Sequence, residues 1–154
     1  MAQPLIVVRH HRRKLNTMDW IALDERQQTG HALIDEDHER VVALINQLAS
    51  AITQHQSKDI CGALLDQIIQ NTKTHFAREN RLMAEHHYPR AEEHVTQHAR
   101  LVEEAQSLKR WFDSAAVESV MSVSLLHFLE SWWTEHIPTS DQALADFIAS
   151  AKTA

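Results

Sequence analysis

The sequence predicts an all-α domain, an up-down-up-down antiparallel four-helix bundle with an N-terminal arm and a short C-terminal helix. The 154 residues, 44% of them hydrophobic, are enough for one domain with its own core. Only two Gly and three Pro occur, so turn signals are rare. Between them, apolar residues recur at spacings of three and four. We therefore expect long amphipathic helices joined by short connections.

Residues 1–33 are predicted to be an arm packed on the bundle, and residues 34–154 to be the single bundle domain. The arm shows no helical period. It contains a basic cluster that is able to contact an acidic protein partner or a phosphate surface. We prefer a solvated arm, held to the bundle by apolar anchors at Leu15, Trp20 and Ile21. The basic cluster consists of Arg9, His10, His11, Arg12, Arg13 and Lys14.

A residue suited to cap a helix, Ser57, separates the first two predicted helices. The first should begin near Asp35, whose carboxylate suits a helix start, and end near Gln54. Ser57 then offers a cap for the second helix, which we place at about 58–86. Both segments carry apolar residues on one face.

The next connection is marked by Tyr88 and Pro89, because proline is accepted in the first turn of a helix and disfavours helix in the residue before it. The third helix should span about 90–113 and the fourth about 117–137. Both have the three-and-four apolar spacing of helices that face a core.

The end of the fourth helix carries two candidate ligands five residues apart, His136 and Asp141. That spacing fits one continuous α-helix poorly. Pro138 lies between them and should break the helix, so that a broken turn brings Asp141 back towards His136. After the break, Ser140 should cap a last short helix that ends near Ser150.

Two further pairs have the spacing of metal ligands on a helix. His75 and Glu79 are four residues apart, as are His94 and His98, so each pair lies on one helix face. His38 lies beside the apolar stripe of the first helix and should point inward with it. If the helices alternate in direction, all these positions fall in one layer near one end of the bundle.

The ligand set indicates two metal ions. Five imidazoles and two carboxylates without a thiolate are unlike a closed structural zinc site and exceed what one ion accepts. If both carboxylates bridge and an oxide or hydroxide bridges as well, eleven of the twelve positions of two octahedra are filled and one stays open. The set is His38, His75, Glu79, His94, His98, His136 and Asp141.

The other histidines need no metal to explain them. His127 serves as a control, because it stands nine residues before His136 and should face away from the site. His86 and His87 sit at a helix end, where a cation interacts favourably with the helix dipole. We leave seven histidines unassigned: His10, His11, His31, His55, His86, His87 and His127.

Composition narrows the functional classes. The formal net charge of −6 argues against broad nucleic-acid binding. No apolar run approaches the roughly 18 residues that cross a bilayer, and residues 4–8 are too short for a signal-peptide core. The single Cys61 excludes an internal disulfide and is compatible with a reducing compartment. We expect a cytoplasmic monomer that binds neither nucleic acid nor membrane.

Four blocks of the chain resemble the hemerythrins, in particular the bacterial hemerythrins. The resemblance covers about residues 20–147, and all seven ligand positions carry the expected residue type. It implies an oxo- or hydroxo-bridged di-iron centre. His94, His98 and His136 would bind one iron, His38 and His75 the other, and Glu79 and Asp141 would bridge them. The blocks are IleAspGluAspHis (34–38), HisPheAlaArgGluAsnArgLeuMet (75–83), TyrPro with HisValThrGlnHis (88–98) and TrpTrpThrGluHisIleProThrSerAsp (132–141).

The chain departs from the family at two positions. Asn80 stands where a second Glu usually follows the bridging glutamate, and we expect this change to alter surface charge only. Trp133, three residues before the last ligand histidine, stands where Leu commonly covers the gas pocket. With Val41, Phe76 and Met83 it is expected to line a dry apolar pocket. Simple core packing is an equal interpretation of Trp133.

The resemblance implies a non-enzymatic protein that reversibly binds dioxygen at one open iron position, for storage, delivery or scavenging. Two alternatives remain. One is a sensor module for dioxygen, nitric oxide or redox state, with the basic arm as its output element. The other is an enzyme on the same irons, such as a nitric oxide reductase or a peroxidase. An oxidase of the ferritin-like kind is disfavoured because the chain has no GluXXHis motif.

Overall fold

The computed structural model describes residues 20–22, 25–114 and 118–153. A 3-10 turn, η1 (Glu25–Gln27), precedes four long helices and a π-helical turn, and a shorter helix ends the chain. The later elements are α1 (Ala32–Thr53), α2 (Lys58–Glu85), α3 (Ala91–Ser114), α4 (Glu118–His136), η2 (Ile137–Asp141) and α5 (Gln142–Thr153).

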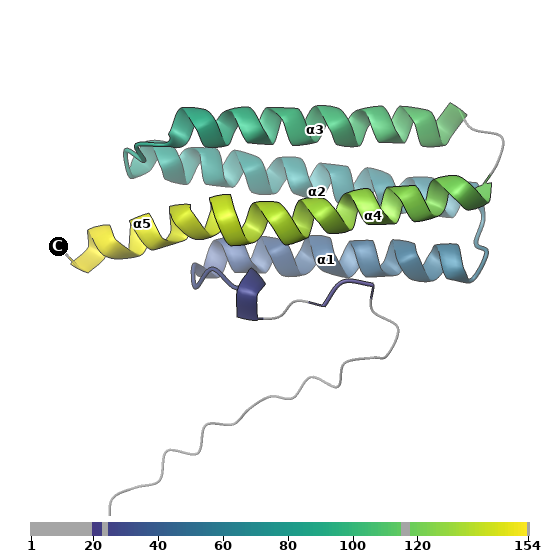
Figure 1. Cartoon of the computed structure of the whole chain (residues 1–154), viewed down its shortest axis with the longest axis horizontal. Coiled ribbons are helices and arrows are strands. Elements are labelled where there is room, and N and C mark those ends of the chain that lie inside the picture. Colours follow the sequence, from purple (N-terminus) through teal and green to yellow (C-terminus); the bar gives the residue numbers. More distant parts are fainter. Residues whose placement is uncertain (1–19, 23–24, 115–117, 154) are drawn as a thin grey trace, which may run out of the picture.

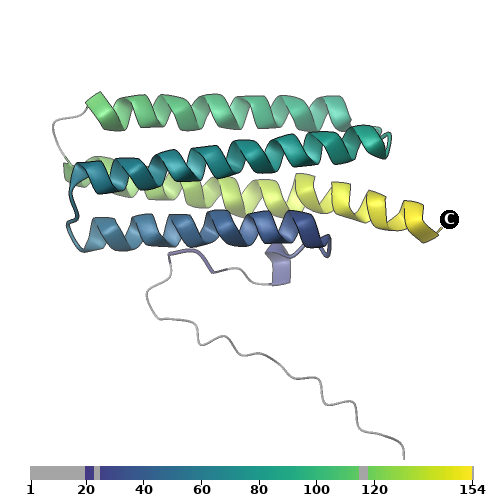
Figure 2. The ribbon, with the colours of Figure 1, turned by 180° about the vertical axis from the view of Figure 1, so that it is seen from behind.

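The four long helices form an antiparallel bundle, as predicted (Figure 1). α1 and α3 run in one direction, and α2 and α4 run in the other (Figures 1 and 2). Because α2 is joined to both neighbours by short connections, these three helices must lie antiparallel side by side. Within the described residues, no helix is both long enough and apolar enough to cross a membrane.

The helix starts follow local chemistry. Ser57 caps α2 as expected, since its hydroxyl oxygen accepts a hydrogen bond from the N–H of Ile60 at 3.4 Å. α1 begins three residues before the predicted Asp35. The Asp35 carboxylate instead accepts hydrogen bonds from the backbone N–H groups of Thr29 at 2.8 Å and Gly30 at 3.0 Å. It therefore fixes the loop that leads into α1.

The described part of the arm contacts the bundle at Trp20 and Ile21. Ile21 is buried, and its backbone N–H and C=O both bond to the Asn46 side chain, each at 2.9 Å. The Trp20 ring lies edge-on to His127, with ring centroids 5.5 Å apart. The basic cluster and Leu15 lie outside the described residues, and the domain boundary at residue 33 stays a prediction.

The expected helix break at Pro138 is wrong. The chain runs from α4 through η2 into α5 as a continuous ribbon, with a π-helical turn in place of the break (Figure 1). Pro138 lacks an N–H for the ordinary bond, and the N–H of Gln142 reaches Ile137 O, five residues back. One π turn brings residues five apart onto the same side, so Asp141 faces His136 without a break. Consequently Ser140 does not cap a separate helix.

Two apolar clusters lie on either side of the layer that holds the candidate ligands. The main core fills the bundle between the layer and the α1–α2 turn, with Val41, Leu48 and Trp133 among its members. A smaller cluster, here called the end cluster, joins α1, α2 and α5 at the other side. It consists of Ile34, Leu82, Met83, Tyr88, Leu144 and Ile148. The layer therefore has apolar side chains on two of its sides, which keep water away from those sides.

Candidate metal centre

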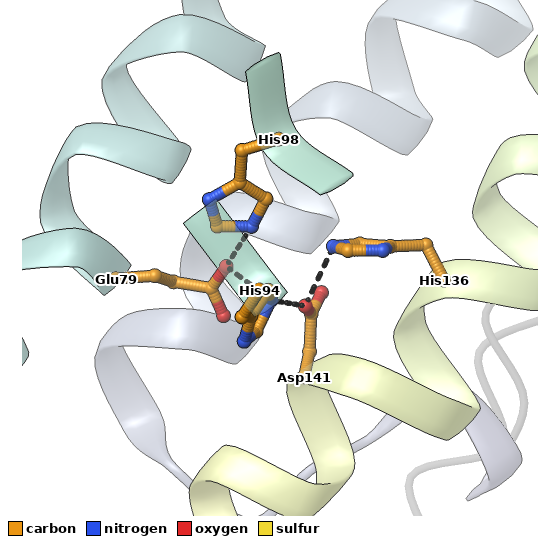
Figure 3. Close-up of side chains that lie close together, drawn as sticks. All are labelled: Glu79, His94, His98, His136 and Asp141. Carbon is orange, nitrogen blue, oxygen red and sulfur yellow. Dashed lines mark hydrogen bonds and ion pairs between the residues drawn. The ribbon is translucent and has the colours of Figure 1, made fainter. Parts of the chain in front are cut away.

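All seven candidate ligands lie together inside the bundle. The four long helices supply the five histidines and Glu79, and η2 supplies Asp141. Figure 3 shows five of the seven, with the histidine rings turned towards the two carboxylates. Each of the seven is buried, and both Glu79 and Asp141 have no exposed surface. The described residues that could hold a metal fall into two groups that share Asp141: His38 and His75, and Glu79 with His94, His98 and His136.

Asp141 presents one carboxylate oxygen to each histidine group. Its Oδ1 lies 3.1 Å from His94 Nε2 and 3.0 Å from His136 Nε2. Its Oδ2 lies 3.0 Å from His38 Nε2 and 3.7 Å from His75 Nε2. This is the arrangement of a carboxylate shared between two sites. We call the groups the two-histidine half (His38, His75) and the three-histidine half (His94, His98, His136).

Glu79 also faces both halves. Its Oε2 lies 3.1 Å from His98 Nε2 and 3.7 Å from His94 Nε2 in the three-histidine half. The same oxygen lies 3.5 Å from His75 Nε2 in the two-histidine half. Every histidine of the cluster thus directs Nε2 inward, which leaves Nδ1 for interactions behind the ring.

Several polar atoms at the centre have no hydrogen-bond partner in the protein. His75 Nε2, His98 Nε2 and both carboxylate oxygens of Glu79 are buried without a hydrogen-bond partner. Buried polar atoms are nearly always paired, and several orphans in one place indicate a bound ion. Imidazole nitrogens and carboxylate oxygens are ligands that suit iron and other transition metals. The cluster therefore fits a metal centre.

The two carboxylates differ in their proton affinity. Burial and the nearby charge of Asp141 raise the pKa of Glu79 well above its ordinary value. Burial also favours protonation of Asp141, but hydrogen bonds from the surrounding histidines, His136 and His38 foremost, hold its pKa well below the ordinary value. The site thus contains a firmly ionised Asp141 beside a Glu79 that lacks sufficient compensating cations, a deficit that a metal would remove.

His75 is supported from behind by a residue that the sequence reasoning missed, Asp37. The buried Asp37 places Oδ2 3.6 Å from His75 Nδ1, an ion-pair distance that is too long for a hydrogen bond, while Arg78 donates to Asp37 Oδ1 at 2.8 Å. Metal-bound histidines usually have a carboxylate, a backbone carbonyl or a water behind the ring, which orients the ring and raises its basicity. The available signal was an acidic residue directly before the candidate ligand His38.

Asn80 is a correction to the expectation that it affects surface charge alone. It is half-buried, and its Oδ1 lies 3.0 Å from Nδ1 of His98, so the ring N–H donates to the amide oxygen. Asn80 therefore fixes the tautomer that leaves His98 Nε2 free to face the centre. Its place directly after Glu79 gave no periodic signal, because adjacent residues point about 100° apart on a helix.

The four residues expected to line a gas pocket belong to two apolar clusters, with three of them in the main core. Trp133 is edge-on to His38, with ring centroids 5.2 Å apart, and so covers the two-histidine half. Phe76 stacks on His98 of the three-histidine half, with ring centroids 3.8 Å apart, and also contacts the ring of His75, with centroids 5.4 Å apart. Val41 is fully buried in the main core, whereas Met83 belongs to the end cluster. The assignment of a gas pocket to these four residues stays a prediction.

The described histidines left unassigned lie outside both groups. His127 faces away from the centre as predicted, with 64% of its side chain exposed and Glu130 3.4 Å from its ring. His55 and His87 stand in the turns after α1 and α2 with positive φ. His10 and His11 fall outside the described residues.

Comparisons with known proteins agree with this geometry. The family model of the hemerythrin HHE cation binding domain matches residues 29–148. A protein named bacteriohemerythrin from Stenotrophomonas maltophilia is 31% identical over 117 residues, which are 76% of this chain and 74% of the relative. A bacteriohemerythrin from Ralstonia nicotianae is 26% identical over 132 residues, covering 86% of this chain and 91% of that relative.

The fold also matches a solved structure, the crystal structure of a mutant hemerythrin, with a TM-score of 0.75. That match covers 84% of this chain and 98% of the other at 22% identity, so it supports the fold alone. The family model spans most of the chain and includes all seven clustered residues. The protein belongs to the hemerythrin family, and its buried histidine and carboxylate cluster is able to bind metal.

Proposed function

We propose that the chain holds two iron ions and reversibly binds dioxygen at one of them. The three-histidine half would supply His94, His98 and His136 to one ion, and the two-histidine half would supply His38 and His75 to the other. Glu79 and Asp141 would bridge the ions. The single observation that carries this proposal is Asp141, whose two carboxylate oxygens each face one half.

The count of ligands supports an open position. With two shared carboxylates, the ion of the three-histidine half has one more protein nitrogen than the ion of the two-histidine half. Only the latter would then be short of a ligand within an octahedral sphere. When bound, the iron ions supply the open position and the electrons that hold dioxygen.

The surroundings of the two-histidine half favour a binder over an enzyme. Trp133 is buried in the main core and lies edge-on to His38, so its aromatic ring adjoins this half. Apolar walls admit a neutral gas and limit the entry of water and protons. The charged pair behind His75, Asp37 and Arg78, is on the Nδ1 side of the ring, away from the centre. The cytoplasmic location and monomeric state stay predictions.

The proposal is tested by iron content together with the visible spectrum of the reduced protein. The protein is reduced without air, exposed to air, and then freed of air again. We expect two irons per chain and a ligand-to-iron absorption band that appears with air and disappears on its removal. Two irons that oxidise at once without a reversible band would overturn reversible dioxygen binding and favour redox sensing or nitric oxide chemistry.

A further inference from the structure

The indole N–H of Trp133 is a buried donor without an acceptor. The side chain is 3% exposed, and Nε1 is among the buried polar atoms of the described residues that have no hydrogen-bond partner. Leaving such a donor unpaired is unfavourable, and buried tryptophan N–H groups usually find a partner. An orphan of this kind is therefore expected to have an acceptor that the protein alone does not contain.

The position of the indole indicates where that acceptor would lie. The ring is edge-on to His38 and lies over His75, with a centroid separation of 6.4 Å and an interplanar angle of 28°. These are the two histidines of the two-histidine half. The neighbouring Trp132 instead contacts Phe76, the ring that stacks on His98 in the three-histidine half. Only Trp133 of the two adjoins the half where a ligand position would be open.

A second unpaired donor lies on α2, three residues before His75. Thr72 is 1% exposed, and its Oγ1 has no hydrogen-bond partner. Other described helix threonines bond back to the carbonyl four residues earlier, as Thr74 does to Gln70 O at 3.0 Å. Four more do the same: Thr53, Thr96, Thr134 and Thr139. The hydroxyl of Thr72 is thus kept free of the bond that its residue type normally makes in this fold.

The helix directions place the two donors at one level. Thr72 stands three residues before His75 on α2, and Trp133 stands three residues before His136 on α4. α2 and α4 run in the same direction (Figure 1), so both donors lie about one turn from the ligand layer, on the side of the main core. Thr72 also lies on the stripe of α2 that carries His75 and Glu79, since these positions are three and seven residues further on.

We propose that Trp133 N–H and Thr72 O–H form a hydrogen-bonding pocket for a small ligand that carries negative charge in the two-histidine half. The class includes azide and other small anions, and dioxygen once it draws charge from the metal. A hydrogen bond to a charged acceptor is stronger than one to a neutral acceptor, so the pocket selects for charge on the ligand. This inference rests on the proposed function, because the ligand is held at the open iron position.

The first test is azide titration of the oxidised, iron-loaded protein, followed by visible absorption. Trp133→Phe removes the N–H and keeps an aromatic ring of similar position, and we expect azide affinity to fall about tenfold. Thr72→Val removes the hydroxyl at constant shape, and we expect a loss of about threefold. The matched controls are Trp132→Phe and Thr74→Val, which should bind azide as the parent does. The infrared stretch of bound azide should shift in the Trp133 and Thr72 variants only.

The second test needs no iron, and it uses a variant only to assign a signal. The chain has four tryptophans, so the metal-free protein labelled with 15N-tryptophan gives four indole N–H signals. The Trp133 signal is identified by its loss in Trp133→Phe. We expect it at the highest field of the four, as for a donor without an acceptor, and slow to exchange with D2O. A low-field, hydrogen-bonded signal would overturn the proposal.

The outcomes separate this inference from the proposed function. If the unsubstituted protein binds no iron, the proposed function is refuted. The indole N–H signal of Trp133 in the metal-free protein then decides the inference by itself. A parent that binds iron and azide, with Trp133→Phe equal to it in affinity and infrared stretch, would refute the inference alone. If only Thr72→Val matches the parent, the part assigned to Thr72 is wrong and that of Trp133 stands.

Discussion

His75 and His98 are both buried histidines whose Nε2 atoms face the same Glu79 oxygen, yet their surroundings differ in kind. Behind His75 stands the Asp37 carboxylate, held by Arg78. Behind His98 stands the neutral amide of Asn80. The two halves of the centre therefore combine similar inner ligands with a charged support on one side and an uncharged support on the other.

The two histidines also differ in proton affinity in the metal-free protein. Burial lowers the pKa of His75, but the carboxylates of Asp141 and Asp37 outweigh it and raise the pKa to about 10. Burial lowers the pKa of His98 to about 2, with His94 adding to the effect. The comparison teaches that a residue behind a ligand, Asp37, adds to the difference that burial and the neighbouring ligands make between the halves.

The largest effect should come from Asp141, the residue that the halves share. In Asp141→Ala both ions lose a ligand, and we expect iron content to fall from two per chain to nearly none. Iron analysis of the purified variant measures this, with circular dichroism to confirm that the helices persist. Two irons per chain in this variant would show that Asp141 does not link the halves.

Removing a histidine should empty one half and spare the other. We expect His75→Ala to retain one iron per chain, and His98→Ala likewise, each with the bundle still folded. The physical reason is that the remaining half keeps its own imidazoles and both carboxylates. If iron stayed at two per chain in His75→Ala, the assignment of that ligand would be wrong.

The opposite pKa shifts predict that the two histidines stabilise the metal-free protein in opposite pH ranges. The pKa of His75 is raised, so its stabilising contribution is complete below its ordinary value of 6.5 and is lost as pH rises towards about 10. The pKa of His98 is lowered, so stability is lost as pH falls from 6.5 towards about 2.

We therefore expect His75→Gln to flatten the alkaline decline in the free energy of unfolding and His98→Gln to flatten the acid decline. Urea unfolding of both variants and the parent from about pH 5 to about pH 9.5 measures these slopes. Identical pH dependence of the two variants would contradict the electrostatic difference between the halves.

Most of the fold followed from the sequence because the helix signals were local. The cap at Ser57 and the stop at Tyr88 and Pro89 each depend on a few adjacent residues, and the structure has both. Pro138 is the exception, because its missing N–H is accommodated by a π turn in which the N–H of Gln142 reaches Ile137 O.

The clustered residues were also foreseeable, since four-residue spacing has a fixed meaning on a helix. The supports behind them were not. Asp37 and Asn80 are adjacent in sequence to inward-facing residues, so periodicity places them off the buried face. Their contacts arise between helices, with Asp37 of α1 reaching α2 and Asn80 of α2 reaching α3, and a single sequence does not specify such pairs.

The support of the two-histidine half should matter more than that of the other half. Asp37→Asn keeps the shape and removes the charge behind His75, so we expect iron affinity of that half to fall about 10- to 100-fold. Competition with a chelator of known affinity measures it. Arg78→Gln, which leaves Asp37 in place, should have a smaller effect, and an equal loss in both variants would indicate a general packing defect.

The smallest effect should come from making the halves alike. Asn80→Asp places a carboxylate behind His98, where the ring N–H would donate to a charged acceptor, a stronger bond than the one to the amide. We expect metal affinity of the three-histidine half to rise about threefold, whereas Asn80→Ala, which removes the acceptor, should lower it. Chelator competition on His75→Ala, in which only this half is filled, isolates the change. If Asn80→Asp and Asn80→Ala gave the same metal affinity, the hydrogen bond to His98 would have no influence on metal binding. A charge behind a ligand would then affect metal affinity in the two-histidine half only.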